Sequence, residues 1–292
     1  MNENIVIQWL LEDTDPAVKY RTQTELFDIK KGSKAVKQTC NDLISSEHMK
    51  SVMSLFEIGK NNSDSYALSA LAEYGLTRSD IDIDHYVDRL IDNTNFHDGC
   101  GEGFLLRNLV ALGYEEHPAV KRELSVILTT QQNDGGFPCV SKNPKIKKPN
   151  VPHKSCFQMT TSYLLLTEEM FKKGMDCPQA EGIISYFLGR DVLYRHDNSS
   201  IIVKQEMGTA FHPPVCTRIG LHMILCALSR LGKGDAPECK RAWETLYSKR
   251  GDDGNYILDG SLTKPYIKTT KPGKANKWIT FYALLAEKYR EK

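Results

Sequence analysis

The feature that most constrains the fold of this chain is a repeated pair of helix patterns. Three apolar stretches with helical spacing each reach a glycine at or next to their end, at residues 66–76, 104–114 and 219–232. Glycine directly after an apolar helix is a C-terminal cap signal. A polar turn and a more charged helix pattern follow each of them, at residues 83–93, 117–132 and 235–250. Each charged pattern leads into a glycine-bearing turn, at residues 97–103, 133–137 and 251–256. Two-helix units of roughly 35–50 residues predict an all-α array of hairpins, in which the apolar helices are buried and the charged helices are solvated.

The domain organisation follows from the same pattern. No linker divides the chain, so we expect a single domain over residues 1–292. With 40% hydrophobic residues the chain is long enough to bury a large core. Periodicity alone fits both an open solenoid and a closed ring with the apolar helices inside.

Charge and hydropathy argue against several classes of function. The 38 basic and 37 acidic residues nearly cancel, and the densest basic stretch, NPKIKKP at 143–149, is short and loop-like, so we expect no nucleic-acid partner. No apolar run approaches the ~18 residues of a membrane span. The first residues lack a basic region, so we expect no signal peptide, a cytoplasmic location, and cysteines that are reduced or bound to metal. The sequence indicates no specific protein partner.

One turn carries a family resemblance. Residues 131–137, QQNDGGF, resemble the QW-type repeat of the terpenoid cyclase and protein prenyltransferase superfamily. The stretches at 15–26, 100–114, 153–166, 229–258 and 273–285 are similar to a bacterial branch known as prenyltransferase or squalene-oxidase repeat proteins. The resemblance covers nearly the whole chain. It implies an α/α toroid of inner and outer helices, and an enzyme acting on an apolar, isoprenoid-type ligand in a central cavity.

The catalytic motif of one branch of this superfamily is incomplete here. Class II terpene cyclases protonate their substrate with a DxDD motif, whereas SDIDIDHYVD at 79–88 lacks the adjacent pair of aspartates. This stretch lies where a helix is expected to start, and Asp80, Asp82 and Asp84 fit capping and dipole-favourable roles there.

The alternative to an enzyme is a non-catalytic ligand-binding or scaffold protein with a structural zinc ion or none. The aromatic content of 9% favours this alternative.

Four potential zinc ligands occupy related positions in the repeat. Cys100 and Cys139 follow successive charged helices, and His153 and Cys156 stand where the next apolar helix begins. In an array of hairpins these turns lie at one end, so the four side chains can converge. Three thiolates and one imidazole suit tetrahedral zinc, while buried thiols or a disulfide pair explain the same cysteines without metal.

Three further residues are candidates for catalytic groups. His212 and Cys216, in FHPPVCTRIG at 211–220, precede another apolar helix and would face the same end as the four potential ligands. His196 ends a charged helix, where a basic side chain also interacts favourably with the helix dipole. Packing explains Cys216 equally well, and the sequence specifies neither the substrate nor the reaction.

Overall fold

The computed structural model describes residues 3–93, 101–138, 155–194, 200–201, 208–214, 220–260 and 270–290. These residues are mostly helical, which confirms the all-α class. The described strands are β1 (Ser155–Cys156) and β2 (Ser200–Ile201), which pair in parallel over two residues each. Within the described ranges, no helix is both long and apolar enough to cross a membrane.

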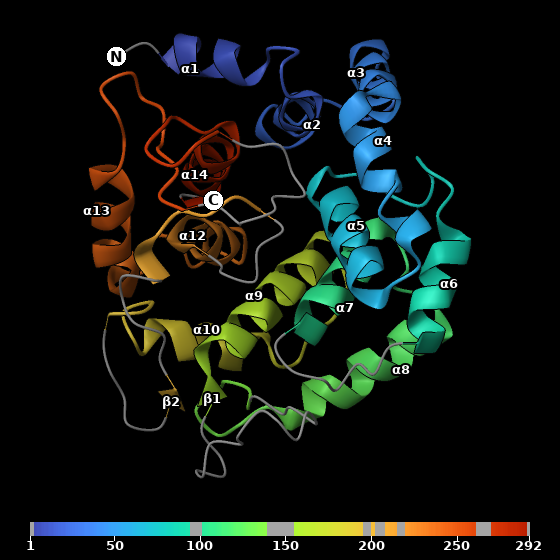
Figure 1. Ribbon diagram of the computed structural model, residues 1–292. Helices are drawn as coiled ribbons and strands as arrows, with labels where there is room; N and C mark the ends of the chain where they lie inside the picture. The colour runs from blue at the N-terminus through green and yellow to red at the C-terminus, as the bar shows by residue number, and fades with distance from the viewer. Residues whose placement is uncertain are drawn as a thin grey trace.

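Five helices form the centre of the described structure, and we call them the inner helices. They are α5 (Asn61–Glu73), α7 (Gly101–Leu112), α9 (Phe157–Lys172), α12 (Leu221–Arg230) and α14 (Lys277–Arg290). Each contacts the next in chain order, and α14 also contacts α2 (Pro16–Arg21) and the π-helical turn η1 (Thr22–Leu26). Arg21, at the end of α2, bonds to Glu73 at the end of α5. The succession of contacts therefore returns to the helix where it began (Figure 1).

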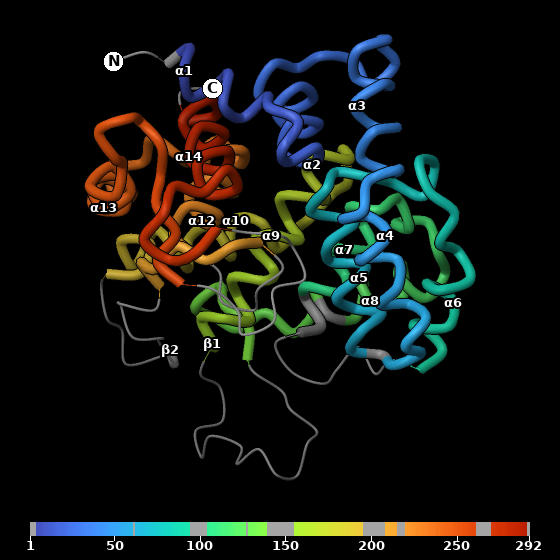
Figure 2. Tube along the Cα trace, turned by 45° about the horizontal axis from the view of Figure 1, so that its top comes forward, coloured from blue at the N-terminus to red at the C-terminus, as the bar shows by residue number. Residues whose placement is uncertain are grey.

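The remaining helices lie around the inner helices, as Figures 1 and 2 show for α6, α8 and α13. These outer segments are α1 (Glu3–Leu10), α3 (Lys34–Ser45), α4 (Glu47–Met53), η2 (Phe56–Ile58), α6 (Asp84–Asn93), α8 (Pro118–Ile127), η3 (Leu128–Thr130), α10 (Ala180–Leu188), η4 (Pro237–Cys239) and α13 (Lys240–Ser248). The predicted charged helices are confirmed as α6, as α8 with η3, and as η4 with α13. The faces that they bury are mainly apolar, as Val87 and Leu90 of α6 illustrate.

The predicted glycine caps are confirmed. Gly75, Gly113 and Gly232 have φ of 73°, 94° and 73°, and Gly174 after α9 has 68°. In each case the residue after the glycine donates its N–H to the carbonyl five positions earlier, as Leu76 does to Leu71 at 3.3 Å. This is the Schellman arrangement, which needs a left-handed residue that only glycine adopts without strain. Four inner helices therefore end in the same way.

The QQNDGGF stretch forms a turn that follows η3 and is hydrogen-bonded to residues at the start of α9. The Phe137 N–H donates to Thr160 Oγ1 at 3.0 Å, and Cys156 N–H donates to the Phe137 carbonyl at 2.7 Å. A Cβ on Gly135, whose φ is 82°, would lie 2.0 Å from the Gly182 carbonyl oxygen. The glycine is therefore required both by the turn and by the close approach of α10.

The turn at residues 251–256 repeats this geometry before α14. Gly254 has φ of 86°, and the Tyr256 N–H donates to Thr280 Oγ1 at 2.9 Å. Tyr256 is fully buried, as is Phe137 at the equivalent position. The two turns thus share a left-handed glycine, a buried aromatic ring and a threonine of the following inner helix.

Candidate functional site

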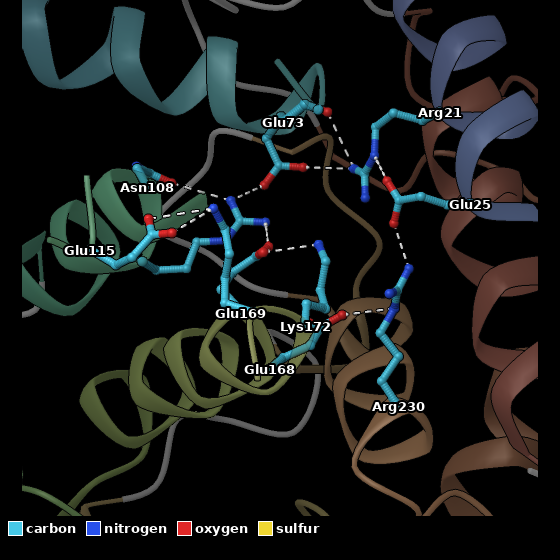
Figure 3. Close-up of polar contacts among 12 residues, drawn as sticks. Arg21, Glu25, Glu73, Asn108, Glu115, Glu168, Glu169, Lys172 and Arg230 are labelled. Atoms are coloured by element: carbon cyan, nitrogen blue, oxygen red, sulfur yellow. Dashed lines mark hydrogen bonds and ion pairs between the residues drawn. The ribbon is translucent and has the colours of Figure 1, made fainter. Parts of the chain in front are cut away.

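Charged side chains gather where the inner helices approach their C-terminal ends, and we call them the central charge cluster (Figure 3). Its members are Arg21, Glu25, Glu73, Arg107, Asn108, Glu168, Glu169, Lys172, Arg230 and Tyr282. Their positions follow from the repeat. Glu73, Lys172 and Arg230 stand two residues before their capping glycines, and Arg107 and Glu168 stand six residues before theirs. Positions four residues apart share one face of a helix, so these side chains meet at one level.

Glu73 links its own helix, α5, to three other elements of the cluster. One carboxylate oxygen accepts a hydrogen bond from Arg107 at 2.5 Å, and the other accepts from the Tyr282 hydroxyl and from Arg21 at 3.4 Å. Arg21 also donates to the Glu73 carbonyl at 3.2 Å. The Glu73 side chain is buried, so α2, α5, α7 and α14 are joined by contacts away from water.

Glu25 and Glu168 extend these contacts to α12. Glu25 accepts from Arg21 at 2.5 Å and from Arg230 at 2.5 Å. Arg230 also lies 3.1 Å from a Glu168 carboxylate oxygen. Burial acts to raise the pKa of Glu25, but the charges of Arg21, Lys172 and Arg230 outweigh it and hold that pKa well below the usual range.

The adjacent residues Glu168 and Glu169 have opposite electrostatic surroundings. Glu169 lies 3.2 Å from Arg107 and 2.9 Å from Lys172. Burial acts to raise its pKa, but the charges of Lys172 and Arg107 lower it to about 2. For Glu168 burial dominates and raises the pKa, although Arg230 opposes it. Glu168 is therefore the carboxyl group of the pair that more readily holds a proton.

The charges of the cluster balance. Arg21, Arg107, Lys172 and Arg230 oppose Glu25, Glu73, Glu168 and Glu169, so four positive and four negative groups sum to zero. Moving such groups out of water is costly, and mutual pairing with good geometry offsets that cost. The arrangement connects the seven elements that contribute to the cluster, which are α2, η1, α5, α7, α9, α12 and α14. It also fills the space between the inner helices at this level with paired charges.

The structure places some of the residues that the sequence predicted as ligands or catalytic groups. Cys100, Cys139, His153, His196 and Cys216 lie outside the described residues. Cys156 stands directly before α9 and is half-buried. His212 is buried and lies beside Gly260, where an added Cβ would be 2.7 Å from its ring. Asp84 begins α6, where it accepts from Tyr114 at 2.5 Å, whereas Asp80 closes the preceding turn by accepting from the Thr77 N–H at 2.8 Å.

The predicted zinc site stays a prediction. Among the described residues, no three or more His, Cys, Asp or Glu side chains form a group that could hold a metal ion. Of the four proposed ligands only Cys156 belongs to that part of the chain. None of the five described cysteines takes part in a disulfide.

Sequence reasoning missed the central charge cluster and a buried histidine. His222 of α12 is fully buried between the rings of Phe211 and Tyr282, with centroids 4.9 and 6.0 Å away. Burial, together with the charges of His212 and Lys249, lowers its pKa to about 3, so it is neutral. A signal for the cluster was present in the sequence: Glu73, Arg107 and Arg230 are charged residues within or at the end of otherwise apolar stretches of α5, α7 and α12.

Comparisons of the chain with protein-family models, with curated proteins and with solved structures find no match.

Proposed function

We propose that the chain folds as an α/α toroid and that it is an enzyme of the terpenoid cyclase and prenyltransferase kind. It would hold a largely apolar, isoprenoid-type ligand among the inner helices, near the ends where these helices start. The observation that carries the proposal is the central charge cluster. Because paired charges fill the space near the C-terminal ends, a ligand would have room only toward the starts of the inner helices.

The contact between α5 and α7 supports this placement. Asn108 Nδ2 donates to Ser69 Oγ at 2.7 Å, which identifies the faces that these helices turn toward each other. About one turn closer to the helix starts, Ser65, Tyr66 and Phe104 are partly exposed. Hydroxyl groups beside aromatic rings suit an apolar molecule that has one polar end.

Zinc belongs to the same proposal. Cys100, Cys139, His153 and Cys156 would hold the ion, and Cys156 fits that role because it is partly accessible and directly precedes α9. The positive end of a helix dipole stabilises a thiolate. A bound zinc ion with an open position would activate a thiol or a water molecule, and one with four protein ligands would be structural.

Ligand binding tests the proposal. We expect farnesol or farnesyl diphosphate to bind the protein in isothermal titration calorimetry, and Phe104→Ala to weaken that binding about tenfold, the cost of about 1.4 kcal/mol of lost apolar contact. Phe171→Ala is the matched control, because Phe171 is 59% exposed on α9. Absence of binding by both ligands, or equal losses in the two variants, would contradict the proposal.

The second candidate is a non-catalytic binding or scaffold protein. The complete charge pairing of the central cluster favours it, because such a cluster stabilises a framework without supplying an unpaired acid or base. Mass spectrometry of the ligand after incubation separates the two candidates. A cyclised, transferred or hydrolysed product supports the enzyme, and unchanged bound ligand supports the binding protein.

A further inference from the structure

The buried imidazole of His222 lies on the face of α12 that reaches the central charge cluster. His222, Cys226 and Arg230 are spaced four residues apart, so their side chains share one face of the helix. Arg230 belongs to the cluster through Glu25 and Glu168. Burial and then the charge of Glu168 raise the pKa of the Cys226 thiol to about 12, which places the thiol beside the same cluster. His222 therefore continues this face toward the start of α12, the end of the inner helices where the proposed function puts the ligand.

Both ring nitrogens of His222 are buried, and neither has a hydrogen-bond partner within the described part of the chain. A neutral imidazole has one N–H donor and one acceptor nitrogen. Native proteins pair almost all of their buried polar groups, because an unpaired group costs the free energy of taking it out of water. An imidazole that is buried in this way weakens the fold, so its presence points to a partner that binds from outside the described residues.

The surroundings of His222 hold its ring in one position. Phe211 and Tyr282 contact the ring edge-on, at interplanar angles of 66° and 65°. Gly220 directly precedes α12, and a Cβ at this position would lie 2.6 Å from the His222 Cε1 atom. Glycine at position 220 therefore leaves the room that the imidazole occupies. Tyr282 in turn donates to Glu73, so the contact ties the ring to the central charge cluster.

We infer that His222 hydrogen-bonds the oxygen-bearing end of an apolar ligand, with one ring nitrogen as the donor. An alcohol and a diphosphate both present oxygen acceptors to an N–H group, and the hydroxyl of an alcohol also donates to the second nitrogen. Because the imidazole is neutral, the contact is a hydrogen bond and not an ion pair, and the weakly basic ring is a poor acceptor of a proton from the ligand. The inference rests on the proposed function, since it names the residue that would bind the polar end of that ligand.

Isothermal titration calorimetry of His222→Leu tests the contact. Leucine is similar in size to histidine and favours helices, so α12 is kept. We expect the variant to bind farnesol and farnesyl diphosphate about fivefold more weakly than the unmodified protein does, the effect of one lost hydrogen bond. A loss confined to one of the two ligands identifies which oxygen the imidazole binds. Farnesene, a related hydrocarbon without oxygen, should bind both proteins equally, and an equal loss for farnesene would assign the effect to packing and overturn the inference.

The stability of the protein without ligand is a second readout. The urea midpoint of His222→Leu should stay the same or rise, because the substitution removes two buried unpaired nitrogens. His117→Leu is the matched control. The Nδ1 atom of His117 accepts the Ala119 N–H at 3.2 Å as the cap of α8, so this midpoint should fall while ligand binding stays unchanged.

The outcomes separate this inference from the proposed function. A lower midpoint for His222→Leu would show that the imidazole has a structural partner, and it would overturn the inference whether or not a ligand binds. Equal binding of farnesol and of farnesyl diphosphate by the variant and the unmodified protein would overturn the inference and leave the proposed function intact. Absence of binding by the unmodified protein would contradict the proposed function and, with it, the inference.

Discussion

Replacing Glu73 by alanine tests whether the central charge cluster holds the inner helices together. The substitution removes the acceptor of Arg107, Tyr282 and one nitrogen of Arg21, in a place where Glu73 and Arg107 are only 2% and 5% exposed. Removing one partner of a buried ion pair costs about 3–5 kcal/mol, because the remaining charge stays buried without compensation. Arg21 keeps Glu25 and Arg107 keeps Glu169, so we expect the lower end, about 3 kcal/mol.

The free energy of unfolding in urea, followed by circular dichroism at pH 7, measures this loss. The transition midpoint should fall while the slope stays unchanged, because the variant exposes the same surface on unfolding. The matched control is Glu47→Gln, which breaks an ion pair to Lys50 whose side chains are 88% and 66% exposed. Such a pair contributes at most about 1 kcal/mol. If Glu73→Ala costs no more than Glu47→Gln, the cluster does not hold the fold together and the reasoning is wrong.

Four further predictions follow from individual residues. Glu169 is ionised above its unfolded pKa of 4.5 and keeps its charge in the fold down to about 2, so acid titration monitored by circular dichroism should show stability falling as pH drops through that window. At pH 7, Glu168→Gln should destabilise less than Glu169→Gln in urea, because burial opposes the charged form of Glu168 more than its ion partner favours it; the reverse order would contradict the assignment. Gly135→Ala should cost at least about 3 kcal/mol, since its Cβ meets backbone at 2.0 Å, whereas Gly174→Ala, with open space around it, should cost about 1 kcal/mol in the same assay. Mass spectrometry should find about one zinc ion per chain, lost in Cys156→Ser; absence of metal from the unmodified protein would exclude the site.

The repeat of helices and caps could be predicted because each signal is local. Gly75 and Gly113 follow their helices directly, and the left-handed conformation that they adopt belongs to a few consecutive residues. The turn around Gly135 was recognisable for the same reason. The hydrogen bond of the Phe137 N–H to Thr160 could not be predicted in the same way, because it joins residues 23 positions apart.

The central charge cluster was missed because its pairs are remote in sequence. Arg21 and Glu73 are 52 residues apart, and Glu73 and Tyr282 are 209 residues apart. In the sequence, each of these charged residues by itself indicates only an interruption of an apolar helix pattern. Their common distance from the capping glycines was the available signal, since it places Glu73 and Arg230 at one level once the helices are aligned by their caps.

The direction of the inner helices gives the two ends of the structure different chemistry. Helix C-termini carry partial negative charge, which favours cations, and Lys172 and Arg230 occupy the last turns of α9 and α12. These cations are in turn paired with carboxylates, so the charges at this end of the inner helices compensate one another. Helix N-termini carry partial positive charge, which favours thiolates and anionic groups, and Cys156 precedes α9 at such a terminus. Under the proposed function, the ligand would therefore place an anionic end, such as a diphosphate, beside the helix starts and its apolar chain toward the central charge cluster. A preference for farnesyl diphosphate over farnesol in calorimetry would agree with that orientation, and a preference for farnesol would reverse it.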